Sequence, residues 1–341
     1  MTAIFLYSIF SIFLMGLILK VTKINWIGKI ERIEPQHIHK GTVPRIGGIY
    51  IYISFLIGSY ISENYMIFNW LIFYIPILLV SIIEDIHTQL NPYLRLFLLS
   101  LFIFIFILNT SFLKLPHIEI SILTFINDNN LYQKIFFSFA LISIMNGNNM
   151  IDGVNGLCIT TFIIQIISLI VLSNYLDIEY VSLIYILIPS VIFLLVNYPF
   201  GKIFLGDTGS YLLSFLSGCL VINFFAQNPE VNIYYALVIL SYPINEMIFS
   251  FFRKLFSNKS SPVKSDAYHL HLIAFKVLKN KYNNQYLANN LVLPNLSIIL
   301  LMPLISYVTY PYINNYATLY IYLSICSVYF ALYYFMKKHQ K

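Results

Sequence analysis

Five polar clusters interrupt an otherwise apolar sequence, and their side chains are of the types that bind phosphate groups and divalent cations. They are the segment 39–48, the acidic pair Glu84-Asp85, the segments 146–157 and 206–210, and the segment 266–271. Carboxylates and amides supply oxygen ligands for a hard cation, while imidazole, guanidinium and ammonium groups bind anionic oxygens. Together these residue types indicate a site for a charged, phosphate-bearing ligand.

The acidic pair directly follows the apolar residues 81–83. Carboxylates so close to hydrocarbon are costly unless they meet a cation or a polar cavity. A solvated helix terminus is the simpler explanation of Glu84 and Asp85. We favour a shared site because two further carboxylates, Asp152 and Asp207, are expected at an equivalent depth.

The amide-rich segment 146–157 has a polar residue at every third position, so a helix would place Asn146, Asn149 and Asp152 on one face. Its glycines allow backbone to approach a ligand closely. Its amides, including that of Asn155, can satisfy phosphate or uracil-type groups without adding charge. The alternative is a polar turn between helices, in which these side chains cap backbone groups.

Asp207 lies in the segment Gly206-Asp207-Thr208-Gly209-Ser210, at the start of an apolar span, where the alternative role is an N-cap. Magnesium sites typically use one or two carboxylates, completed by water and substrate phosphate. Asp207 with Asn149 fits that pattern, so these two residues are the predicted metal ligands.

His269 and His271 follow Asp266 in a lysine-rich loop. On a helix the two imidazoles would diverge, whereas an extended or turn segment would point both to one site, where they could donate to phosphate oxygens. A zinc site is not expected, because no cysteine or further histidine has ligand spacing on this face.

Transmembrane helices must position these clusters. Hydrophobic residues make up 59% of the chain and charged residues 10%, with a mean hydropathy of +0.78, which excludes an ordinary water-soluble domain. Long apolar runs without alternation argue against a membrane β-barrel. We predict one all-α domain over 1–341, a polytopic bundle of about eleven transmembrane helices near 3–21, 46–61, 66–83, 93–113, 132–146, 157–174, 180–197, 208–225, 232–252, 292–309 and 316–336.

The distribution of positive charge predicts how this bundle faces. With an external N-terminus, alternating loops place eighteen of the twenty basic residues on one side, which the positive-inside rule makes cytoplasmic. All five polar clusters fall on that side, so we expect a cytoplasmic cleft and a cytoplasmic C-terminus. The net charge of +6 is then a topology signal, and nucleic acid is not an expected partner, because no folded basic module presents these charges.

Four of the clusters carry a recognisable order of motifs. The pattern Asn146-x-x-Asn149-x-x-Asp152-Gly153-x-Asn155-Gly156-Leu157 is similar to an NxxNxxDGx(D/N)GL signature, and Gly206-Asp207-x-Gly209-Ser210 to GDxGS. Pro44-Arg45-x-Gly47-Gly48 is similar to PRxGG, and Ser261-Pro262 with Asp266-x-x-His269-Leu270-His271 to an SP…DxxHxH segment. Each motif alone is weak. Together they resemble the polyprenyl-phosphate N-acetylhexosamine-1-phosphate transferase family, glycosyltransferase family 4, over nearly the whole chain.

The resemblance implies a multi-pass enzyme of the bacterial inner membrane that transfers a sugar 1-phosphate from a UDP-N-acetylhexosamine, such as UDP-N-acetylglucosamine, to undecaprenyl phosphate, releasing UMP. It implies dependence on Mg²⁺, with Mn²⁺ as an alternative, and a role in priming O antigen of lipopolysaccharide, teichoic acid or another cell-surface glycan. It also implies that Asp207 ligates the metal with help from Asn149, and that Asp85 either acts as a base or positions the lipid phosphate. On this basis the expected catalytic residues are Asp85, Asp152, Asp207, His269 and His271, and the expected substrate-binding residues are Lys40, Arg45, Glu84, Asn146, Asn149, Asn155 and Gly206.

Three positions depart from the family pattern. Glu84 replaces the usual first Asp of the acidic pair, which leaves its role open. Asn155 stands where many bacterial members have Asp, which argues for substrate binding rather than acid catalysis. Leu272 stands where a further His is common, so His269 and His271 are the two histidines of this segment that are left to serve the site.

Two alternatives remain, one within the same enzyme class and one from a different class. One is the phospho-N-acetylmuramoyl-pentapeptide transferase of peptidoglycan synthesis, whose members have three successive histidines where this chain has His269-Leu270-His271-Leu272. The other is a polytopic secondary transporter, whose charges should lie near the membrane midplane in repeated halves. The sequence leaves open which N-acetylhexosamine is used, which glycan is primed, and the oligomeric state, a homodimer included.

Overall fold

The computed structural model is built of helices. It describes residues 2–24, 43–86, 90–109, 113, 115–117, 124–257, 267–308 and 315–340, and these contain no strand, as the all-α prediction requires. In chain order the elements are α1 (Thr2–Ile24), α2 (Gly47–Ile61), α3 (Tyr65–Phe73), α4 (Ile75–Ile86), α5 (Pro92–Leu108), the 3₁₀ turn η1 (Thr124–Ile126), α6 (Asn130–Ile151), α7 (Leu157–Tyr175), α8 (Val181–Asn197), α9 (Gly206–Gln227), α10 (Tyr234–Ile239), α11 (Ser241–Ser257), α12 (Leu270–Tyr282), α13 (Gln285–Val308) and α14 (Asn315–Lys338).

All eleven predicted apolar segments contain helix, but helices and predicted spans do not correspond one to one. Five helices in the described part of the chain, α1, α7, α9, α13 and α14, contain stretches long and apolar enough to cross a membrane, and the bent pair α3–α4 makes a sixth. The apolar helices α2, α5 and α8 are shorter. Several apolar helices make this a multi-pass membrane protein, whereas the count of eleven and the orientation stay predictions.

Two predicted spans are each divided into two helices. The segment 66–83 becomes α3 and α4, which are bent by 52° relative to each other. Pro76, at the second residue of α4, has no backbone N–H, so the helical hydrogen-bond ladder cannot run unbroken through this point. The last turn of the new helix carries Glu84 and Asp85. The segment 232–252 similarly becomes α10 and α11.

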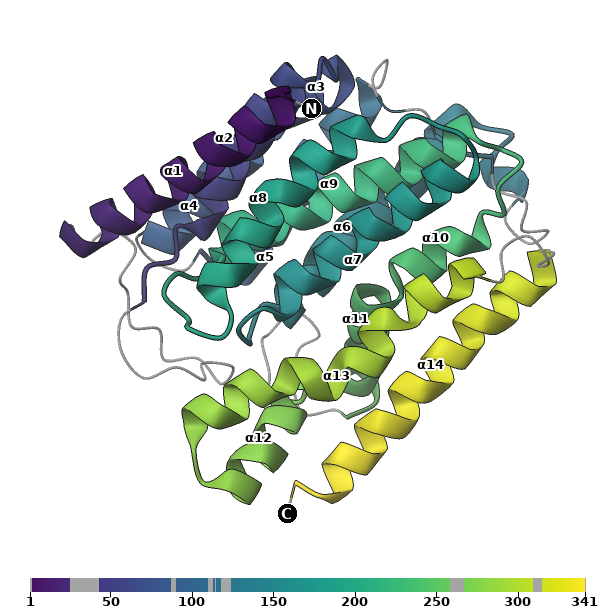
Figure 1. Ribbon diagram of the computed structural model, residues 1–341. Coiled ribbons are helices and arrows are strands. Elements are labelled where there is room, and N and C mark those ends of the chain that lie inside the picture. Colours follow the sequence, from purple (N-terminus) through teal and green to yellow (C-terminus); the bar gives the residue numbers. More distant parts are fainter. Residues whose placement is uncertain are drawn as a thin grey trace.

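Helix α9 lies in the middle of the bundle (Figure 1). Within its apolar stretch 94% of the residues are buried, against 17% for α1 and 22% for α14 at the periphery. It packs against α2, α4, α6 and α7. Small residues let the neighbouring backbones approach closely, and those of α9 are Gly209, Ser210, Ser214, Ser217 and Gly218. The N-terminus of α9, with Asp207, therefore lies at the junction of several helices.

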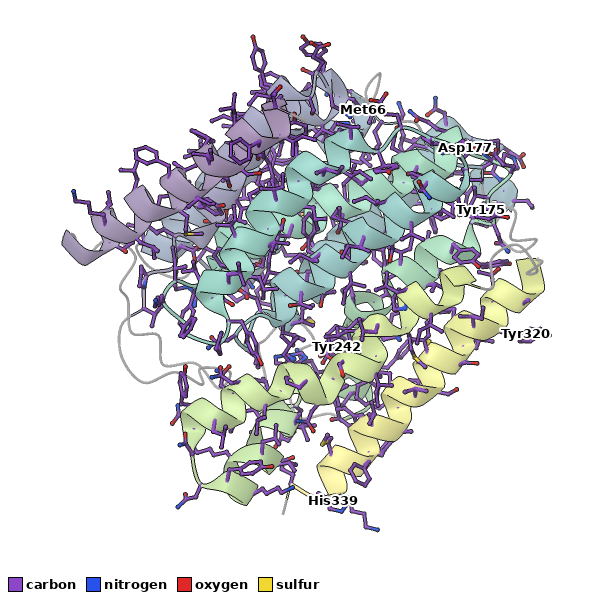
Figure 2. The ribbon with its side chains drawn as sticks, in the orientation of Figure 1. Met66, Tyr175, Asp177, Tyr242, Tyr320 and His339 are labelled. Atoms are coloured by element: carbon purple, nitrogen blue, oxygen red, sulfur yellow. The ribbon has the colours of Figure 1, made fainter. Side chains whose placement is uncertain are left out.

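The two chain ends lie at opposite ends of the helix bundle (Figure 1). Figure 2 likewise shows Met66, Asp177 and Tyr320 at one end and His339 at the other. The first and last helices thus run in the same direction. Such an arrangement is required of a chain whose termini are predicted on opposite faces of a membrane.

Candidate active site

The segment 43–48 is held against the start of α9 by backbone hydrogen bonds. The N–H groups of Gly47 and Gly48 donate to the two carbonyls that immediately precede α9, over 3.0 Å each. A Cβ on Gly48 would collide with the backbone of α9, so glycine is what permits this approach. The Pro-Arg-x-Gly-Gly motif thereby brings Arg45 to the start of α9.

Asp85, at the end of α4, caps α9. Its Oδ1 accepts the backbone N–H of Asp207 over 3.0 Å, and its Oδ2 accepts that of Thr208 over 2.8 Å. The first N–H groups of a helix have no intrahelical partner and form the positive end of its dipole, so a carboxylate is stabilised there. Gly206 has φ +73°, and a Cβ on it would lie 2.5 Å from Oδ2 of Asp85, so the contact requires glycine.

Arg45 and Asn149 complete this group. The Nε of Arg45 lies 3.2 Å from Oδ1 of Asp85, and its Nη2 lies 3.7 Å from Oδ1 of Asp207. Asn149, near the end of α6, donates through Nδ2 to Oδ1 of Asp207 and to Oγ of Ser210, over 3.0 Å each. Four predicted site residues from four segments therefore meet at the start of α9.

Asp152 directly follows α6 and interacts electrostatically with the same group. Burial raises the pKa of Asp152 to about 7, the guanidinium of Arg45 acts against this rise, and the carboxylates of Asp207 and Asp85 add to it. Arg45 in turn interacts with all three carboxylates. These four side chains share one region of the structure.

The loop 152–156 between α6 and α7 is held by two asparagines. Oδ1 of Asn289 accepts the N–H of Asn155 over 3.0 Å, and Oδ1 of Asn197 accepts the N–H of Gly156 over 2.6 Å. The Asn155 residue is 3% exposed, and its Oδ1 has no hydrogen-bond partner among the described residues. The fixed loop therefore presents a buried amide acceptor.

The histidines form a second group. His269 is the extended N-cap residue of α12, and His271 lies in the first turn of that helix. Their rings are nearly parallel, at 12°, with centroids 5.8 Å apart. Nδ1 of His269 lies 2.8 Å from Oε1 of Glu246 in α11. The turn at the start of α12 thus brings the two imidazoles side by side.

His271 connects the two groups. A Cβ on Gly153 would lie 2.9 Å from Nε2 of His271, so this ring faces the loop that begins at Asp152. The ring is fully buried, and neither nitrogen has a hydrogen-bond partner among the described residues. Burial lowers the pKa of His271 to about 3, Glu246 acts against this, and His269 adds to it. His271 is therefore a neutral imidazole at neutral pH.

The other predicted substrate-binding residues are placed differently. Glu84 is buried, with its Oε1 3.5 Å from Nη1 of Arg95 in α5. The amide of Asn146 donates to the carbonyl of Ile142, one turn earlier in α6. Lys40 lies outside the described residues. The substrate roles of these three residues stay predictions.

The adjoining Asp207 and Asn149 offer oxygen ligands of the type that Mg²⁺ takes. Within the described residues there is no group of three or more His, Cys, Asp or Glu side chains arranged to hold a metal ion. Magnesium needs fewer, because water and substrate phosphate complete its coordination. Asn149 turns the nitrogen end of its amide toward Asp207, so the amide must rotate to offer its oxygen to a shared ion. With that rotation the donor set fits Mg²⁺.

Comparison with known proteins shows which proteins this chain resembles. The family model described as glycosyl transferase family 4 matches residues 67–225. A Bacillus subtilis (strain 168) protein named as a probable undecaprenyl-phosphate N-acetylglucosaminyl 1-phosphate transferase is 26% identical over 279 residues, which cover 80% of this chain and 76% of the relative. The chain is thus similar to glycosyl transferase family 4 over residues 67–225.

A second relative matches this chain over a shorter region. It is a Thermotoga maritima protein named undecaprenyl-phosphate alpha-N-acetylglucosaminyl 1-phosphate transferase, 40% identical over 76 residues, or 22% of this chain and 24% of the relative. The region matched by the family model contains Asp85, Asn149, Asp152 and Asp207. Arg45, His269 and His271 lie outside the matched region 67–225. The packing of the helices places them beside the residues inside it.

Several residues that hold the candidate site were not among the predictions. Asn197 and Asn289 bind the loop 152–156, and Arg95 binds Glu84. No spacing in the sequence connects them to the motifs. Glu246 did carry a signal, because a carboxylate inside the predicted span 232–252 is costly without a partner.

Proposed function

We propose that this protein transfers an N-acetylhexosamine 1-phosphate from a UDP-sugar to undecaprenyl phosphate, giving the undecaprenyl-diphosphate-sugar and UMP. The observation that carries the proposal is the meeting of Arg45, Asp85, Asn149 and Asp207 at the start of a buried helix. The names of the two relatives support undecaprenyl phosphate as acceptor and favour UDP-N-acetylglucosamine as donor.

In the proposed reaction an oxygen of the lipid phosphate attacks the β-phosphorus of the UDP-sugar. A P–O bond forms there, the bond from the β-phosphorus to the bridging oxygen breaks, and its electron pair leaves with UMP. The lipid phosphate is already anionic near neutral pH, since the second pKa of a phosphate monoester is about 6. Two anions must approach each other, so the main tasks are charge neutralisation and alignment.

Arg45 is the cation best placed for charge neutralisation in the described part of the site. Its side chain is 16% exposed, so it is not sealed from a ligand, while its contacts to Asp85 and Asp207 hold the guanidinium in place. A held guanidinium needs little reorganisation when negative charge develops beside it. We assign Arg45 to the phosphate groups of the substrates.

The contacts of Asp85 favour positioning over proton transfer. Both of its oxygens accept hydrogen bonds from the start of α9, and one of them also contacts Arg45. Lone pairs engaged in this way are poorly disposed to take a proton. We therefore assign Asp85 to aligning the start of α9 and Arg45, a role that the anionic nucleophile permits.

Asp207 and Asn149 would hold Mg²⁺, or Mn²⁺ in its place. When bound, the ion would offset charge on the diphosphate and on departing UMP. His271 lies beside the loop 152–156, and the ring of His269 lies parallel to that of His271. A neutral His271 has one N–H to donate to a phosphate oxygen, whereas His269, whose Nδ1 contacts Glu246, donates through Nε2 when its ring is protonated.

We place this site at the cytoplasmic face of the bacterial inner membrane, where positive charge concentrates in the predicted topology. The polyprenyl tail would remain in the bilayer, and only its phosphate would reach the site. Such a reaction would prime O antigen, teichoic acid or another surface glycan. Cysteine-accessibility labelling in spheroplasts checks the orientation: residues 85 and 207 must share the cytoplasmic side.

The deciding experiment is a transfer assay with purified protein, undecaprenyl phosphate and radiolabelled UDP-sugars. We expect UDP-N-acetylglucosamine to give labelled lipid and equimolar UMP, EDTA to stop the reaction, and Mg²⁺ to restore it. Asp207→Asn is the inactive control.

Preferential use of UDP-N-acetylmuramoyl-pentapeptide would move the protein to the peptidoglycan branch. Uptake of a solute into proteoliposomes without UMP release would replace the transferase with a transporter.

A further inference from the structure

The buried carboxylate of Glu246 receives three hydrogen-bond donors from two other segments. Oε1 lies 2.8 Å from Nδ1 of His269 and accepts the backbone N–H of Leu270 over 3.2 Å. Oε2 accepts the hydroxyl of Tyr329 in α14 over 2.9 Å. Glu246, His269 and Tyr329 are 1%, 2% and 0% exposed. This one side chain therefore joins α11, α12 and α14.

The contacts divide into two functions. Leu270 is the first residue of α12, and its N–H is one of those that a helix leaves without an intrahelical partner. Glu246 thus caps α12 from a different helix. The contact to His269 is different in kind, because a carboxylate beside Nδ1 keeps the proton on that nitrogen and turns the Nε2 edge of the ring away from itself.

A cap alone does not account for a charged residue at this depth. Burying a carboxylate costs several kcal/mol before its partners compensate, whereas a neutral amide would accept the same two N–H groups at lower cost. The charge acts on the two imidazoles: it orients the ring of His269, stabilising that ring when it carries positive charge, and it opposes the lowering of the pKa of His271. The arrangement resembles metal sites in which a carboxylate fixes the tautomer of a ligating histidine.

Helix α11, which carries Glu246, also packs against α6, the helix that carries Asn149. Gly147 of α6 packs so closely on Pro243 of α11 that a Cβ there would collide with the carbonyl of Pro243. Gly147 lies two residues before Asn149, and Pro243 three residues before Glu246. The position of His269 is therefore set by the helix that packs against the one carrying Asn149.

We propose that Glu246 is a positioning residue of the transferase site, which holds His269 by its Nδ1–H so that the opposite, Nε2 edge of the ring faces the substrates; once Nε2 takes up a proton it donates to a phosphate oxygen, and the carboxylate of Glu246 offsets the charge of the ring. The role of His269 toward phosphate rests on the proposed function. The orientation of His269 by Glu246 does not, and it can be measured without substrate.

The test compares Glu246→Gln, which keeps the size and one acceptor oxygen, with Tyr329→Phe, which removes only the donor to Oε2. Solid-state ¹⁵N spectra of histidine-labelled full-length protein in lipid give the tautomer of His269, assigned by the signal lost in His269→Gln. We expect the Nδ1–H tautomer in the native protein and in Tyr329→Phe. In Glu246→Gln we expect a mixture of both tautomers, because an amide can also donate to Nδ1.

Kinetics supply the second readout. We expect Glu246→Gln to lower kcat about 10- to 100-fold, the usual range for a residue that orients a functional histidine. The KM for the UDP-sugar should stay within about twofold, because this loss is of transition-state rather than ground-state interaction. Tyr329→Phe should retain most of the native kcat.

An unchanged His269 tautomer in Glu246→Gln would overturn the proposal. So would an equal loss of kcat in Tyr329→Phe accompanied by equal loss of thermal stability, since that is the behaviour of a packing residue. If the native protein transfers no sugar phosphate, the proposed function fails, and the tautomer comparison still decides whether Glu246 orients His269.

Discussion

Oδ1 of Asp85 accepts the backbone N–H of Asp207 over 3.0 Å. One carboxylate of the site thus caps the helix that carries another. The carboxylates are tolerated so close together because helix α9 presents its positive end between them, and because Arg45 contacts both. The geometry of the site therefore depends on Asp85 even if that residue never exchanges a proton.

Asp85→Asn should separate positioning from base catalysis. The variant leaves one good acceptor for two backbone N–H groups and removes a charge from Arg45, so we expect kcat to fall about 100-fold. The dependence of kcat on pH should keep its native shape, because no titrating base is lost. Loss of the acid limb of the profile in Asp85→Asn would establish Asp85 as the base.

Arg45→Lys should be damaging although it conserves charge. The guanidinium reaches Asp85 through Nε and Asp207 through Nη2, whereas a single ammonium cannot occupy both positions. We expect kcat/KM to fall about 10- to 100-fold in the transfer assay, which corresponds to roughly 1.4 to 2.7 kcal/mol of transition-state stabilisation. Lys202→Ala, at an exposed lysine before α9, should change little. Near-native activity of Arg45→Lys would mean that only charge is needed.

Gly206→Ala should destabilise the fold and inactivate the site together. The residue has φ +73°, and the new Cβ would lie 2.5 Å from Oδ2 of Asp85. Strain of this kind costs about 1–3 kcal/mol before the displacement of Asp85 is added. Thermal unfolding in detergent measures the effect. Gly16→Ala in α1 is the matched control, because a Cβ there meets nothing within 4 Å. Equal melting temperatures for the two variants would contradict the proposed cap.

The neutral His271 should make stability depend on pH. Its pKa in the folded protein is about 3, below its ordinary value of 6.5, so between these values the folded state binds fewer protons than the unfolded state. Stability should be complete above pH 6.5 and fall as the pH drops, by roughly 1.4 kcal/mol per unit within that window. The comparison is between native protein and His271→Gln, in which the neighbours Glu246 and His269 are retained. The advantage of the native protein should shrink from pH 7 to 4.5, and a constant difference would exclude a buried neutral imidazole.

The sequence by itself determined the helical class, the membrane setting and most residues of the site. These are local properties: apolar runs of spanning length report burial in a bilayer, and a spacing such as Asn149-x-x-Asp152 reports residues about one helical turn apart. Only the tertiary structure decided how those residues are used. It made Asp85 a cap for α9, turned the nitrogen of Asn149 toward Asp207, and supplied Glu246 as the partner of His269. Such contacts join helices that are far apart in the chain. They depend on how closely glycines let two backbones approach, and the spacing of residues in the sequence does not record that distance.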